Sequence, residues 1–76
     1  MSEIVKIDEL GRVKQSGGHK RAPAIVMVCH VAGGHSFLAI SLKSPPGQFN
    51  VAQARELSAL LWKGADILAA ANEDQK

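Results

Sequence analysis

The chain has 76 residues, of which 46% are hydrophobic and only three are aromatic, and its formal net charge is +2. This length predicts one domain, residues 1 to 76, and the apolar content excludes a disordered chain. A lone cysteine excludes an intrachain disulfide, and an N-terminal segment without the pattern of a secretion signal favours a cytoplasmic location. No apolar run approaches the roughly 20 residues of a membrane span, so no membrane partner is expected.

The first half of the chain predicts an antiparallel meander of three or four strands within about residues 3 to 43. Residues 4 to 8 alternate apolar and polar side chains, and Gly11 bends or interrupts that strand. The β-branched run AIVMVCHV, residues 24 to 31, predicts a second strand. Gly33-Gly34 then predicts a tight hairpin that returns as HSFLAISLK.

A two-residue loop at Gly33-Gly34 predicts which side chains share each face of the sheet. One face is apolar and carries residues of both strands: Ile25, Met27, Cys29 and Val31 with Leu38, Ile40 and Leu42. The other face is mixed, with Val26, Val28, His30 and Phe37 on it. One helix covers one face, so we expect it on the apolar side, which leaves Val26, Val28 and Phe37 as a candidate contact surface.

A C-terminal helix over about residues 50 to 72 completes an α+β fold. Asn50 is a favourable N-cap, and Gln53 stands where a capping box needs it. Apolar residues recur at spacings of three and four along the segment, as an amphipathic helix requires. They are Ala54, Leu57, Leu60, Leu61, Gly64, Ile67, Leu68 and Ala71.

A homodimer is expected, because the chain is short, one sheet face is left over and the helix is longer than the strands it covers. Trp62 falls off the apolar stripe, where it either lies over the sheet edge or anchors an interface. Gly64 costs helix stability, which fits a close approach by another backbone.

Neither a metal site nor an enzyme site is predicted, and no cofactor or small-molecule substrate is expected. Cys29 and His30 are strand neighbours that point to opposite faces, while His35 and His19 lack the paired spacing of structural zinc ligands. Cys29 is expected in the core, where a thiol behaves as a small apolar group rather than a nucleophile.

The segment RVKQSGGHKR, residues 12 to 21, is the candidate contact element of the chain. It carries five basic side chains and no carboxylate around a Gly-Gly turn: Arg12, Lys14, His19, Lys20 and Arg21. In a hairpin these charges lie close enough to form one positive field, which suits nucleic acid or an acidic protein surface. The alternative is a solvated turn whose lysines protect a sheet edge.

Two resemblances suggest two functions. The run FLAISL, a loop and AQARELSALL, within residues 37 to 71, resemble the last strand and C-terminal helix of the transcriptional positive cofactor family. That resemblance implies a meander-plus-helix plan, dimerisation and binding of single-stranded DNA, and it carries over no functional residue. In size and style the chain also resembles small phage and mobile-element proteins such as anti-CRISPR inhibitors. We therefore expect a non-enzymatic module that binds a larger protein complex through its basic hairpin, with a dimeric DNA-binding accessory protein as the alternative.

Overall fold

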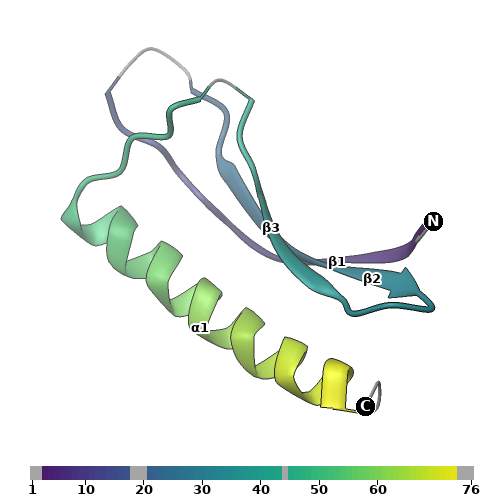
Figure 1. Ribbon diagram of the computed structural model, residues 1–76. Coiled ribbons are helices and arrows are strands. Elements are labelled where there is room, and N and C mark those ends of the chain that lie inside the picture. The colour runs from purple at the N-terminus through teal and green to yellow at the C-terminus, as the bar shows by residue number, and fades with distance from the viewer. Residues whose placement is uncertain (1–2, 18–20, 44, 74–76) are drawn as a thin grey trace.

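The computed structural model describes residues 3 to 17, 21 to 43 and 45 to 73, and it shows a sheet with one helix packed against it (Figure 1). The strands are β1 (Glu3–Val13), β2 (Ala24–Ala32) and β3 (Phe37–Ser41), and the helix is α1 (Val51–Glu73). The sheet is antiparallel with the order β1-β2-β3. The predicted α+β class, with a meander followed by a C-terminal helix, is confirmed.

The capping residues explain why α1 begins where it does. Asn50 Oδ1 accepts a hydrogen bond from the Gln53 backbone N–H at 2.8 Å, and Gln53 Oε1 accepts one from the Asn50 backbone N–H at 3.0 Å. These reciprocal bonds form the capping box that the sequence predicts, and they satisfy two backbone donors near the helix start. The start of α1 at Val51, directly after the N-cap Asn50, agrees with the prediction, and the helix ends at Glu73, one residue beyond the predicted end.

β1 is longer than predicted and irregular. Its register against β2 shifts between Ile4 and Lys6 and again between Glu9 and Gly11. Such β-bulges bend a strand and increase its twist, which agrees with the bend expected at Gly11. Methyl groups of Leu60 lie 2.9 Å from where a Cβ on Gly11 would stand, so the missing side chain also lets α1 approach β1.

The helix covers the opposite sheet face from the one predicted. Val26 and Val28 are 0% exposed. The register sets Val26 beside Gly11, which lies against Leu60 of α1, and Val28 beside Leu38. Val26 and Val28 therefore form the core with Val13 and Ala24, and the prediction that they belong to a contact surface is wrong.

The hairpin between β2 and β3 explains this reversal. Pairing starts at Cys29 with Phe37, one residue out of the register of a two-residue loop, and only Gly33 of the glycine pair has a positive φ, 71°. A shift of one residue moves every side chain of a strand to the other face. The loop is held from outside the hairpin: the Ser36 backbone N–H donates to Asn72 Oδ1 at 2.8 Å, and Asn72 Nδ2 donates to the Ser36 carbonyl at 3.1 Å.

Gly64 is the buried glycine of α1, and its neighbours belong to the same chain. A Cβ at this position would collide with Leu38 Cδ1 and would stand 3.1 Å from Leu10 Cδ1. The glycine therefore admits β1 and β3 side chains rather than a second backbone, which corrects its predicted role in an interface. Within the described residues, no helix is long and apolar enough to cross a membrane.

Candidate interaction surface

The structure separates the basic residues of the 12 to 21 segment. Arg12 makes a two-pronged ion pair with Glu9, in which Nε lies 3.0 Å from Oε2 and Nη2 lies 3.1 Å from Oε1. This pair lowers the pKa of Glu9 and raises the pKa of Arg12. Lys14 is exposed, whereas His19 and Lys20 lie outside the described residues. The charge of Arg12 is thus partly balanced by its own neighbour.

Arg21 ties two loops of the chain together. Its Nη1 donates to the Pro46 carbonyl at 3.0 Å and to Gln15 Oε1 at 3.1 Å. The same Gln15 oxygen accepts the Gln48 backbone N–H at 3.1 Å, and the Ser16 N–H donates to the Gln48 carbonyl at 2.9 Å. The loop after β1 and the loop before α1 therefore lie side by side (Figure 1). Arg21 stabilises this contact, so its guanidinium is not simply presented to solvent.

The sheet face away from α1 is mainly apolar, with one ion pair on it, and we call it the open face. The strand register places on it Ile4, Ile7, Glu9 and Arg12 of β1, Ile25, Met27, Cys29 and Val31 of β2, and Phe37, Ala39 and Ser41 of β3. Ile7 is 56% exposed, Ile4 50% and Phe37 43%. No other helix or strand of the described residues covers this face (Figure 1). Exposed apolar groups on a continuous sheet surface are typical of an interaction site.

The two aromatic residues singled out in the sequence are exposed in different places. Phe37 lies on the open face, where it pairs across the strands with Cys29 of β2. Ile7 of β1 pairs with Cys29 from the other side, and Cys29 is buried between the two. Trp62 is 78% exposed on α1, so its indole does not lie over the sheet edge. Its predicted part in an interface stays a prediction.

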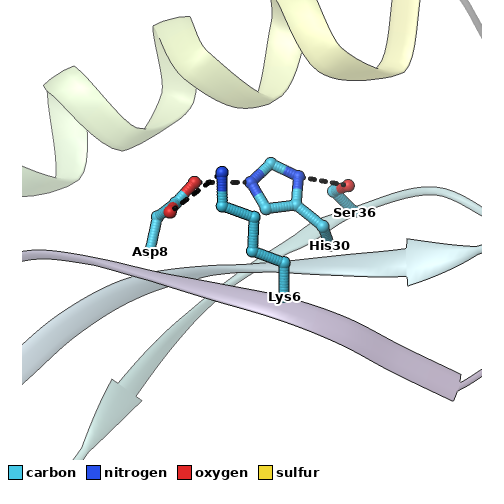
Figure 2. Close-up of polar contacts among 4 residues, drawn as sticks. All are labelled: Lys6, Asp8, His30 and Ser36. Carbon is cyan, nitrogen blue, oxygen red and sulfur yellow. Dashed lines mark hydrogen bonds and ion pairs between the residues drawn. The ribbon is translucent and has the colours of Figure 1, made fainter.

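A polar cluster that sequence reasoning missed lies between the sheet and α1 (Figure 2). His30 Nε2 lies 2.8 Å from Asp8 Oδ2, and His30 Nδ1 lies 3.3 Å from Ser36 Oγ. Because a carboxylate only accepts, Nε2 is the donor, and in the neutral imidazole Nδ1 then accepts from the Ser36 hydroxyl. Lys6 Nζ is 3.6 Å from the other Asp8 oxygen. The cluster could have been predicted only from the β1–β2 register, which pairs Lys6 with His30.

A serine, a histidine and an aspartate in series resemble a hydrolytic triad, but the surroundings of Ser36 favour a structural role. Acyl transfer needs backbone N–H groups free to stabilise an oxyanion. The Ser36 N–H instead donates to Asn72 of α1. The cluster thereby links β1, β2, the loop before β3 and the end of the helix. Among the described residues, no group of three His, Cys, Asp or Glu side chains is placed to hold a metal ion.

Acid should weaken the fold through Asp8. The hydrogen bond with His30, helped by Lys6, holds the pKa of this carboxyl below its ordinary value of 3.8. A group whose pKa is lower in the folded state stabilises the fold above its unfolded pKa, and that stability is lost as pH falls through the folded pKa. The Asp8→Asn variant should therefore show a shallower loss of unfolding free energy between pH 5 and pH 2 in urea titrations. Glu9→Gln removes the other carboxyl whose pKa is lowered, through its pair with Arg12, so it should also reduce the acid loss. An unchanged slope in Asp8→Asn would contradict the role of Asp8.

A shallow groove of about 320 Å³ runs between β1 and α1. It is lined by Gly11, Arg12, Val13, Glu56, Ala59 and Leu60. Small-molecule sites are usually enclosed and have several converging polar groups. This groove is open, and only two of its lining residues are charged, which suits an inserted side chain of a larger partner better than a bound substrate.

Within the described residues, the geometry thus offers an extended surface, the open face, and the exposed Lys14 lies just beyond the end of β1. The resemblance of residues 37 to 71 to the transcriptional positive cofactor family stays a prediction, since comparison of the chain with family models, curated proteins and solved structures found no match.

Proposed function

We propose that the chain is a non-enzymatic module that binds a larger protein by docking it on the open face. The observation that carries this proposal is the exposure of Ile4, Ile7 and Phe37 on a sheet face that α1 leaves uncovered. Burying such side chains is worth about 25 cal/mol for each Å² of apolar area removed from water. A protein that acts by occupying a partner's surface, as small inhibitors do, needs a face of this kind.

Charge on the described residues favours a protein partner over nucleic acid. Nucleic-acid affinity depends on unpaired cations that neutralise phosphates, and single strands also stack on aromatic rings. On the open face, Arg12 is balanced by Glu9, and Phe37 is the one aromatic residue. Arg21 is held in the contact between loops. Binding of single-stranded DNA remains the alternative outcome of the experiment below.

The basic segment of residues 12 to 21 has a secondary role in this proposal. Arg12 is the last residue of β1 on the open face, and the exposed Lys14 stands two residues later, so positive charge lies beside the apolar surface. Charges at the rim of an interface raise the association rate more than they slow dissociation. We propose that Lys14 and Lys20 steer an acidic region of the partner toward the open face.

Replacing the exposed apolar side chains should abolish partner binding without unfolding the chain. The test variant is Ile7→Ser with Phe37→Ser, and the matched control is Val51→Ser, which changes an exposed apolar residue at the start of α1. Each tagged protein is purified from its native host, and the stoichiometry of any co-purified protein is measured by native mass spectrometry. The control should retain a stoichiometric protein partner that the test variant loses, with circular dichroism showing that both are folded.

Two results would overturn the proposal. One is a stoichiometric partner that the folded Ile7→Ser, Phe37→Ser variant retains in full. The other is co-purified nucleic acid that is lost on Lys14→Glu with Lys20→Glu and kept by the open-face variant. That second result would support the DNA-binding alternative. Arg21 is left unchanged because its substitution would also release the contact between loops.

A further inference from the structure

The two edge strands of the sheet differ in how they are protected. β1 has two register irregularities and carries Lys6, Asp8, Glu9 and Arg12. β3 pairs with β2 without interruption from Phe37 to Ser41 and contains no charged residue, no proline and no glycine. Natural proteins guard edge strands with bulges and charges because an unguarded edge pairs readily with another strand. By this criterion β1 is guarded, while β3 remains available for pairing.

Ile40 of β3 shows incomplete burial in the single chain. Its register partner is Val26, so it lies on the sheet face that α1 covers. Yet Ile40 is 41% exposed, while Val26 is 0% exposed. Ile40 is exposed because β3 is an edge strand, and a further strand paired with β3 would cover this side chain.

We propose that two copies of the chain pair antiparallel through β3, with the two-fold axis at Ala39. This register is the one in which all five residues of the strand are paired. It sets Ile40 opposite Leu38 of the partner subunit, twice by symmetry, and Phe37 opposite Ser41 of the partner subunit. Cross-strand apolar pairs of this kind stabilise a sheet, and no like charges within the strand oppose each other.

The pairing produces one six-stranded sheet. Residues directly opposite in an antiparallel pair lie on the same face, so the two open faces become one continuous surface and both α1 helices lie on the other side. This assembly goes beyond the proposed function and does not depend on it. Dimerisation is measured on the purified chain alone, whereas partner binding is measured on host complexes.

The first experiment compares two exposed isoleucines. Ile40→Lys places a charge on the proposed interface, and Ile7→Lys places the same charge on β1, which is the other edge of the sheet. Light scattering should give a dimer mass for the wild type and for Ile7→Lys at about 100 μM, and at least a tenfold weaker association for Ile40→Lys. A monomeric wild type would overturn the proposal. So would dimers lost in Ile7→Lys and kept in Ile40→Lys.

The second experiment tests the register. Opposed residues of an antiparallel pair have Cα atoms about 4.5–5.5 Å apart, which a disulfide can bridge. In a Cys29→Ala background, Ala39→Cys should therefore give a covalent dimer with oxidised glutathione. Ser41→Cys lies on the same face, but the two copies would be offset by four residues, about 14 Å, and should stay uncrosslinked. Equal crosslinking of both variants, or none of Ala39→Cys in a sample that is dimeric by mass, would overturn the register.

Discussion

The Val26→Asp variant is expected to leave the protein unfolded at neutral pH. Val26 is fully buried, and its register partners are Gly11 and Ile40, neither of which has a side chain that pairs with a carboxylate. An unpaired charge in such a site typically costs about 3–5 kcal/mol. The core of a chain this short supplies a stability of roughly the same size. Circular dichroism should show the loss of the helical signal without a cooperative thermal transition.

The same substitution on the open face provides the control. Ile7 is more than half exposed, so Ile7→Asp should keep its carboxylate hydrated and lower the unfolding free energy by no more than about 1 kcal/mol, the range of strand propensities. Urea titration of both variants measures the difference. A cooperative melt for Val26→Asp together with an unfolded Ile7→Asp would mean that α1 covers the other face.

The face covered by the helix could not be predicted from the sequence, because β2 is apolar on both sides. Ile25, Met27 and Cys29 alternate with Val26 and Val28, so hydrophobic pattern alone does not choose between them. The choice depends on the register with β3, and that register is linked to Asn72 bonding to Ser36 across 36 residues of sequence. A contact between distant segments has no local signal in the sequence.

Features set by neighbouring residues were predictable. The helix start follows from Asn50 and Gln53, which are three residues apart and bond to each other's backbone. The meander follows from strand-forming runs separated by glycine pairs. The candidate surface could be predicted only in part. The exposure of Phe37 was expected, but the hydrogen bond from Arg21 to the Pro46 carbonyl joins loops 25 residues apart. Local charge alone suggested that Arg21 was free.

Filling the space at Gly64 should destabilise the protein, although helix propensity predicts the reverse. Replacing a helical glycine with leucine gains up to about 1 kcal/mol from propensity. Here the new side chain would enter space that Leu38 already occupies, and Leu10 is close on the other side. Overpacking typically costs about 1–3 kcal/mol, occasionally more, and a whole leucine belongs at the upper end of that range. A net loss of about 2 kcal/mol is therefore expected for Gly64→Leu in urea unfolding.

A double-mutant cycle identifies the collision as the cause. Leu38→Ala alone should destabilise the fold by leaving a cavity, but in the Gly64→Leu background it makes room for the new side chain. The two changes should then cost less together than the sum of their separate effects, with a coupling of about 0.5–3 kcal/mol. Ala65→Leu, at the next and exposed position of α1, should change stability by no more than about 0.5 kcal/mol. A stabilised Gly64→Leu, or strictly additive effects with Leu38→Ala, would show that α1 does not rest on β3 through this glycine.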